Sequence, residues 1–185
     1  AFNHREKVNP TGQYAIFGVI FNDPRLATTD DQGYAALKYA QSFQNDFDLT
    51  ARLYYNTYYH AIGYPYSPTA AGWEQDTGEW WGAELQLNKR LWDRHIVTLG
   101  AEYRDDFLQE QQVSGQDPKT GGRQSYGVYA QGDFAVLTNL HFNAGVRYDQ
   151  TGDFDAAFNP RLALIYNPVK TSTFKALYGT AFRAP

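Results

Sequence analysis

The chain has 185 residues and a formal net charge of −4, and 17% of its residues are aromatic (4 Trp, 15 Tyr and 12 Phe). It has no Cys, which excludes a disulfide scaffold, a thiolate metal site and Cys-based catalysis. The acidic balance without a basic run argues against a nucleic-acid partner, and no segment approaches the ~18 apolar residues of a membrane helix. The mean hydropathy of −0.58 is polar, but a membrane barrel with one apolar face also averages to a polar value.

The dominant periodicity after residue 32 is two, with apolar or aromatic residues alternating with polar ones, as in a half-buried strand. We expect residues 1–31 to be the end of an earlier strand plus a long external loop, in which residues 13–21 form a strand or a hairpin. The expected strands after it cover residues 33–43, 47–59, 81–91, 95–104, 125–136, 140–149, 159–166 and 173–182. No segment has the periodicity of a helix.

The connections between these strands alternate in length. Short turns are expected at residues 44–46, 92–94, 138–139 and 167–171, and long polar connections at residues 60–77, 107–122 and 150–158. Short turns on one side and long loops on the other are typical of outer-membrane barrels, whose tilted strands need about ten residues to cross the bilayer. The sequence therefore predicts an all-β, antiparallel up-and-down transmembrane β-barrel segment of about eight strands.

Aromatic residues gather near the expected strand ends. Rings with a polar handle favour the membrane–water interface, although aromatic residues also pack well in any sheet. The residues predicted to form two interfacial girdles are Tyr55, Tyr59, Trp81, Trp92 and Tyr166.

The predicted segment is not a closed barrel. The first and last expected strands would place both chain ends on the long-loop side, and an open sheet leaves edge groups that lipid cannot satisfy. We therefore expect residues 1–185 to be one partial outer-membrane barrel domain, a slice of a larger barrel, with about eight antiparallel strands in residues 32–185.

No catalytic constellation emerges from the sequence, so an enzyme, a metal site and a cofactor are not predicted. The four His form no HxxxH or HExxH pair, and there is no GxSxG or Walker-type motif. The carboxylate pairs Asp30–Asp31 and Asp105–Asp106 fit either cation binding or solvated loops, and we favour the loops. The residues expected to line a lumen or contact a plug are Arg52, Glu84, Glu102, Arg104, Arg147, Arg161, Lys175 and Arg183.

Several stretches resemble the barrels of TonB-dependent outer-membrane receptors. The most specific are residues 159–166 (NPRLALIY) and 174–185 (FKALYGTAFRAP). Weaker similarity lies in residues 21–25, 78–84, 99–105 and 143–149. The resemblance implies a bacterial outer-membrane location, a plugged barrel of about 22 strands, a plug domain, a TonB box, and active uptake of a scarce ligand such as a ferric siderophore or cobalamin. Neither the plug nor the TonB box is visible in this sequence.

Ligand contacts are expected in the external connections. Tyr64, Tyr66 and Trp73, with Arg123 at a strand end, suit an aromatic or anionic ligand, although packing within the loops is the plainer role for each. Two other functions stay open: a passive porin-like barrel, and a soluble ligand-binding barrel of lipocalin type. The parent reading frame discriminates between them, because only the receptor needs a plug.

Overall fold

The computed structural model describes residues 1–8, 13–15, 18–20, 22–67, 69–152 and 154–181. None of these residues is helical, and no membrane-crossing helix occurs among them. The strands are β1 (Phe2–Val8), β2 (Gln13–Ala15), β3 (Gly18–Ile20), β4 (Ala27–Phe43), β5 (Phe47–Pro65), β6 (Ala71–Leu91), β7 (His95–Val113), β8 (Lys119–Leu137), β9 (Leu140–Thr151), β10 (Ala157–Val169) and β11 (Ser172–Gly179). The predicted all-β class is confirmed.

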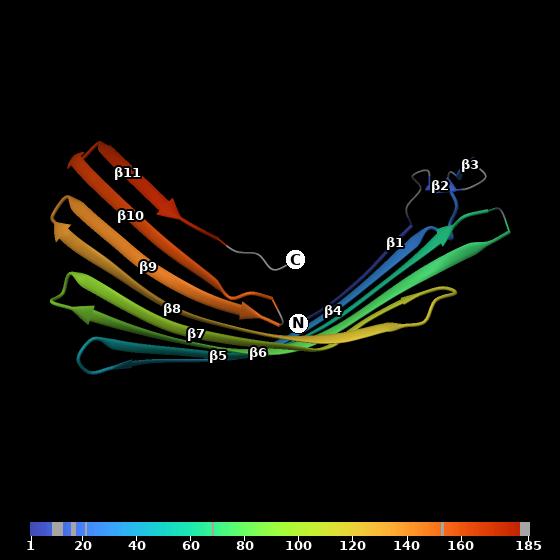
Figure 1. Ribbon diagram of the computed structural model, residues 1–185, viewed down its shortest axis with the longest axis horizontal. Coiled ribbons are helices and arrows are strands. Elements are labelled where there is room, and N and C mark those ends of the chain that lie inside the picture. Colours follow the sequence, from blue (N-terminus) through green and yellow to red (C-terminus); the bar gives the residue numbers. More distant parts are fainter. Residues whose placement is uncertain (9–12, 16–17, 21, 68, 153, 182–185) are drawn as a thin grey trace. The chain divides into compact units, whose positions relative to one another are not determined.

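One nine-stranded sheet contains most of the chain, in the order β1-β4-β5-β6-β7-β8-β9-β10-β11 (Figure 1). Strands that follow one another in the chain are neighbours in the sheet, so the predicted antiparallel up-and-down topology is confirmed. Strands β2 and β3 form a separate antiparallel pair, which is the hairpin alternative expected within residues 13–21.

Tight turns join the strands at one end of the sheet. The turns at residues 44–46, 92–94 and 138–139 match the prediction, and the β10–β11 turn is shorter, at residues 170–171. Asn45 and Asp46 have φ of 67° and 56°, and Trp92 and Asp93 have φ of 51° and 58°. Two consecutive left-handed residues are the signature of a type I′ hairpin turn, whose twist matches that of the flanking strands.

The strands at the other end extend well beyond the predicted bounds. The expected connection at residues 60–77 is mostly the end of β5 and the start of β6, and that at residues 107–122 is mostly β7 and β8. Strand β4 begins at Ala27, so the predicted boundary at residue 31 falls inside it. These extensions are polar on both faces, so they lack the alternation that reveals a strand in sequence.

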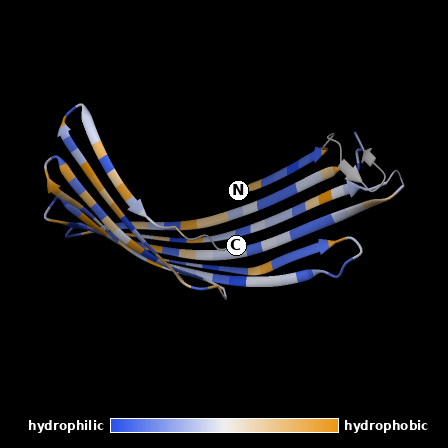
Figure 2. Ribbon diagram, turned by 45° about the horizontal axis from the view of Figure 1, so that its top comes forward, coloured by the Kyte–Doolittle hydropathy of each residue, from blue (hydrophilic) through white to orange (hydrophobic). Residues whose placement is uncertain are grey.

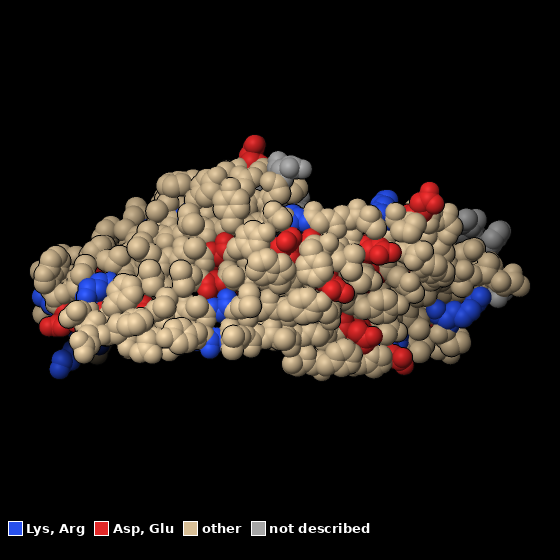
Figure 3. Space-filling model, turned by 90° about the horizontal axis from the view of Figure 1, so that it is seen from below, with Lys and Arg blue, Asp and Glu red and all other residues tan. Residues whose placement is uncertain are grey.

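Hydropathy alternates along the strands, as Figure 2 shows. One face carries exposed apolar side chains such as Leu53 (51% exposed), Val128 (50%) and Leu162 (44%). Alternate positions carry polar side chains, and both signs of charge are dispersed among uncharged residues in the view of Figure 3. Each strand of the sheet therefore presents an apolar face and a polar face.

The chain divides into two compact units. Unit 1 comprises residues 1–36, 54–81 and 105–123, and contains the ends of the strands remote from the tight turns. Unit 2 comprises residues 37–53, 82–104 and 124–185, and contains the tight turns. The candidate site has elements in each unit, and they are described in turn.

Candidate functional site

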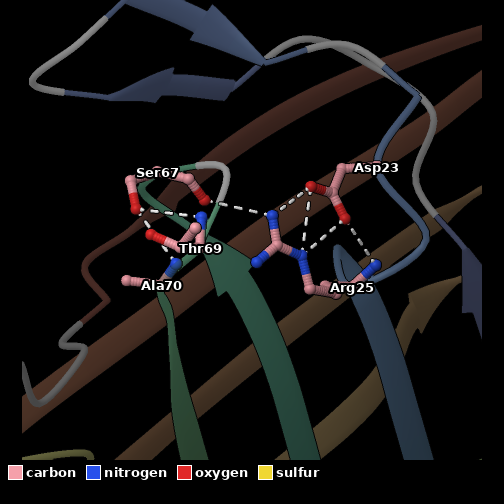
Figure 4. Close-up of polar contacts among 5 residues, drawn as sticks. All are labelled: Asp23, Arg25, Ser67, Thr69 and Ala70. Carbon is pink, nitrogen blue, oxygen red and sulfur yellow. Dashed lines mark hydrogen bonds and ion pairs between the residues drawn. The ribbon is translucent and has the colours of Figure 1, made fainter.

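In unit 1, a turn that precedes β4 is fastened to the tip of the β5–β6 hairpin (Figure 4). The Leu26 N–H donates to the Asp23 carbonyl oxygen at 3.1 Å and closes the turn. The Arg25 Nε and Nη2 atoms donate to the Asp23 carboxylate at 2.6 to 3.2 Å. Nη2 also donates to the Ser67 carbonyl oxygen at 3.1 Å. We call Asp23, Arg25 and Ser67 the Arg25 clamp, because one guanidinium joins two external segments.

The hairpin tip holds Ser67 in place. The Ser67 hydroxyl oxygen accepts hydrogen bonds from the N–H of Ala70 at 2.9 Å and of Thr69 at 3.3 Å. The Tyr66 N–H donates to the Ala70 carbonyl oxygen at 3.2 Å. A serine that caps its own turn restricts the local backbone. The carbonyl group that receives Arg25 is therefore presented in one orientation.

Close backbone packing accompanies the clamp. A Cβ atom on Gly63 would lie 2.5 Å from the Arg25 carbonyl oxygen, so only glycine lets the turn approach β5 this closely. Pro65 is fully buried and Leu26 is 9% exposed, and both lie close to clamp residues in sequence. The clamp is thus set in one of the best-buried parts of the described chain.

Charge pairing keeps the clamp ionised. The Asp23 side chain is 14% exposed and that of Arg25 is 36% exposed. Hydrogen bonds from the Arg25 side chain, and then from its backbone N–H, lower the pKa of the Asp23 carboxyl below its ordinary value. Asp23 therefore stays negatively charged at any pH near neutral.

A second polar cluster in unit 1 surrounds Asp30 of β4. Its carboxylate accepts hydrogen bonds from Arg5 Nη2 of β1 at 2.5 Å and from the Tyr58 hydroxyl of β5 at 3.1 Å. The Nδ1 atom of His60 lies 2.8 Å from the same carboxylate. The Arg5 and His60 hydrogen bonds, in that order, lower the pKa of Asp30 to about 2. This cluster ties three strands together through one carboxylate.

The predicted carboxylate pairs lie in strands rather than in loops. Asp31 contacts His4, and the Asp106 carboxylate lies 3.6 Å from Arg123 Nε. Asp30, as described above, is also paired with a base. Within the described residues, no group of three or more His, Cys, Asp or Glu side chains is arranged to share a metal ion. These carboxylates serve to pair strands.

The four predicted ligand contacts have different surroundings. Tyr66 lies in the β5–β6 tip next to Ser67 and is 43% exposed. Trp73, near the start of β6, is 39% exposed, and its backbone carbonyl accepts the Ser114 N–H at 2.9 Å. The Tyr64 ring covers Gly72, where a Cβ would lie 2.5 Å from it. Tyr66 and Trp73 are therefore the accessible aromatic side chains, whereas Tyr64 packs across the hairpin.

Arg123 is engaged by a buried acid. The Asp106 side chain next to it is only 3% exposed, and that of Arg123 is 34% exposed. A Cβ on Gly122 would lie 3.0 Å from the Asp106 carbonyl oxygen, so β7 and β8 approach closely here. Part of the charge expected for an anionic ligand is thus already balanced within the sheet.

In unit 2, polar side chains reach across whole strands. Arg147 of β9 donates from Nη2 to Glu102 Oε2 of β7 at 2.7 Å, passing over β8. The Tyr129 hydroxyl of β8 donates to Gln86 Oε1 of β6 at 3.0 Å, passing over β7. Arg147 Nε also donates to Asp149 at 2.7 Å. These contacts link four strands on the polar face.

Glycines make these crossings possible. A Cβ on Gly100 of β7 would lie 2.1 Å from Tyr129 Cζ, and one on Gly127 of β8 would lie 2.7 Å from Arg147 Nη2. Each long side chain therefore lies over a glycine of the strand that it crosses. As a result these side chains run along the wall.

The other polar-face predictions fall at several places. Arg52 of β5 forms an ion pair with Glu84 of β6. A polar hollow of about 190 Å³ is lined by Arg161 and Arg147, with Glu102, Tyr129, Gln131 and Asn159 among its other residues. Arg104 lies in β7 and Lys175 in β11, where Lys175 is in register with Ile165. Arg183 lies outside the described residues.

The predicted girdle residues have partly or fully exposed rings. Tyr55 is 39% exposed, and its hydroxyl donates to Glu79 at 2.5 Å. The exposures of the others are 36% for Trp81, 82% for Trp92 and 42% for Tyr166, and Tyr59 is half-buried. Trp92 and Tyr166 lie near tight turns, and Tyr55, Tyr59 and Trp81 lie further along the strands. Their placement at an interface stays a prediction.

Sequence reasoning missed the clamp and the Tyr129–Gln86 contact. The Asp-Pro-Arg tripeptide at residues 23–25 signals a turn. It does not signal the bond to Ser67, which lies 42 residues further along the chain. Finding that bond requires the strand register.

Comparison with known proteins was made for the whole chain. The family model described as TonB dependent receptor-like, beta-barrel, matches residues 1–185. A crystal structure titled as a G324V mutant of the ferric enterobactin receptor from Pseudomonas aeruginosa is similar, with a TM-score of 0.73 at 16% sequence identity. The match covers 85% of this chain and 26% of that receptor, so this chain spans about a quarter of its length. No curated protein matches the chain.

Proposed function

This chain belongs to the family of TonB-dependent receptor-like β-barrels, and from that premise we propose that it forms part of the wall and external surface of a bacterial outer-membrane receptor for active uptake. The proposed ligand is a ferric siderophore, with cobalamin as the second candidate. The similar receptor of Pseudomonas aeruginosa is named for ferric enterobactin, which supports the siderophore class.

The observation that carries the proposal is the length and two-faced character of the strands. Strands β4 to β8 have 17 to 21 residues each, whereas a tilted strand crosses a bilayer in about 9–11. Counted from the tight turns, the crossing part of β4 is about residues 33–43, and the remainder of the strand projects beyond the membrane. An exposed apolar face on that part suits lipid, and the polar face suits a lumen.

The polar face is the proposed contact for a plug domain. Ion pairs such as Arg147–Glu102 lie along the wall, next to the hollow lined by Arg161 and Asn159. Arg52, Glu84, Arg104, Lys175 and Arg183 complete the proposed plug-facing set. Partners of this kind would include the receptor's own plug and the TonB system.

A passive barrel has the same faces but needs no energy. The two functions are separated by uptake of radiolabelled iron, supplied as a panel of ferric siderophores, into cells that produce the full-length receptor containing this chain. We expect uptake of at least one member in cells with TonB and a loss of uptake in cells without it. Equal uptake in both strains would support the passive barrel, and uptake of labelled cobalamin alone would support the second ligand.

A soluble lipocalin-like barrel would bury its apolar residues around a cavity. In that case the full-length protein would stay in the aqueous phase of a detergent partition. We expect it in the detergent phase, because the apolar faces of β5 and β6 expose residues such as Leu53 and Leu85.

A further inference from the structure

The Arg25 clamp joins two external segments that the proposed function places at the mouth of the receptor. One segment is the turn before β4, and the other is the β5–β6 tip that carries Tyr66. We propose that Arg25 is a positioning residue, which fixes the β5–β6 tip so that Tyr66 is preorganised for ligand contact. This inference rests on the proposed function, because it assigns a role in the same binding event.

The contacts make Tyr66 dependent on Arg25. The guanidinium is bonded on one side to Asp23 and on the other to the Ser67 carbonyl oxygen at 3.1 Å, one residue beyond Tyr66. The Ser67 hydroxyl, in turn, orders the N–H groups of the tip. A hydrogen bond from an ionised donor is about twice as strong as a neutral one. Removal of the guanidinium therefore releases the segment that precedes Tyr66.

A second link holds the other side of the same hairpin. The Trp73 carbonyl accepts from Ser114 at 2.9 Å, and Gln111 Nε2 donates to Glu74 Oε1 at 2.7 Å. The tip is thus held by β4 through Arg25 and by the β7–β8 ribbon through Ser114. A loop fixed in its binding conformation loses less entropy when ligand binds, and this raises affinity without a new contact.

The test uses the full-length receptor in outer-membrane vesicles. Because the chain has no Cys, a Thr69→Cys substitution supplies a spin-label site in the tip that is unique within it. We expect Arg25→Ala and Asp23→Ala to increase the mobility of the label. Arg25→Lys should give a partial restoration, since lysine keeps the charge but lacks the guanidinium fork. The matched control is Arg5→Ala, which breaks another Arg–Asp pair of unit 1 that does not touch the tip.

Binding is then measured with the ferric siderophore that the uptake panel identifies. Arg25→Ala should weaken affinity on the order of tenfold, the effect of ordering one or two side chains. In a Tyr66→Ala background the same substitution should have little further effect, because a positioning residue acts through the group that it positions. A general structural role would weaken binding equally in both backgrounds.

The outcomes separate the two levels of inference. Unchanged label mobility in Arg25→Ala, or an equal loss of affinity with and without Tyr66, overturns the positioning role. A wild-type receptor that binds no ferric siderophore overturns the proposed ligand class, and the label mobility still decides whether the clamp holds the tip.

Discussion

The contact of Tyr129 with Gly100 allows a sharp test of the polar face. We expect Gly100→Ala to destabilise the receptor, because the new Cβ would lie 2.1 Å from Tyr129 Cζ, inside any normal van der Waals separation. The Tyr129 ring would have to move by more than an ångström, and it would lose its 3.0 Å hydrogen bond to Gln86. Its packing beneath Arg147, whose Cζ lies 5.7 Å from the ring centroid, would be disturbed as well.

The magnitude follows from opposing terms. Overpacking costs about 1–3 kcal/mol, and a lost hydrogen bond costs about 0.5–1.5 kcal/mol. Replacement of a strand glycine by alanine returns about 0.5–1 kcal/mol of backbone entropy. A net loss of about 1–2 kcal/mol is therefore expected for Gly100→Ala. The assay is urea unfolding of the full-length receptor in lipid vesicles, followed by Trp fluorescence and by heat-modifiable electrophoretic mobility.

Two further variants make the test specific. Gly121 of β8 has open space where its Cβ would be, so Gly121→Ala should be neutral or stabilising by up to about 1 kcal/mol. In Gly100→Ala/Tyr129→Ala the clash is absent, so the double variant should be no less stable than Tyr129→Ala alone. If Gly100→Ala is as benign as Gly121→Ala, or if the double variant shows no relief, the inferred crossing of Tyr129 over Gly100 is refuted.

Three other expectations follow from the described contacts. Asp30→Asn should lower receptor stability near neutral pH; since the folded pKa of Asp30, outside the membrane-crossing part, is depressed from 3.8 to about 2, the difference from wild type should fade as the pH drops from about 4 towards 2 in acid unfolding, and a constant difference would contradict this. Arg147→Ala should cost about 1 kcal/mol in urea unfolding, because the half-exposed Glu102 loses its partner, and an unchanged midpoint would argue against the pairing. Trp92→Asn should stabilise the receptor by about 1 kcal/mol in detergent, because Trp92 has a φ of 51° and asparagine tolerates that conformation; a smaller gain in lipid vesicles would measure interfacial anchoring by the ring, and a loss in detergent would refute the strain argument.

Sequence alone predicted the parts of the fold in which one face of a strand is apolar. Residues 33–43 alternate clearly and were expected as a strand, whereas residues 27–32 of the same strand were assigned to a loop. The difference is physical: the assigned part has lipid-compatible residues at every second position, and the extension faces water on both sides. Periodicity detects burial in an apolar phase, and it is silent where a strand is held by backbone pairing alone.

The candidate site was less predictable because its contacts depend on register. Arg147 and Glu102 were each expected on the polar face, but their pairing across β8 depends on Gly127 beneath the guanidinium. Arg123 was expected to face ligand, and it pairs with a buried Asp106 that the sequence presents as one of two solvated carboxylates. The Arg25–Ser67 bond joins residues far apart in the chain, and no local pattern encodes such a distance.

The projecting ends of β5 and β6 also constrain how the external surface can change in length. Residues 66–70 are the whole connection between these strands, so the segment that looks like a long loop in sequence is a paired ribbon, rising about 3.3 Å per residue. A deletion of one residue from such a ribbon turns every later side chain to the opposite face. Removal of two residues from each strand would instead shorten the ribbon and keep its faces. Length variation at the mouth of such a receptor should therefore come in steps of two per strand, and tags or labels are best inserted within residues 66–70.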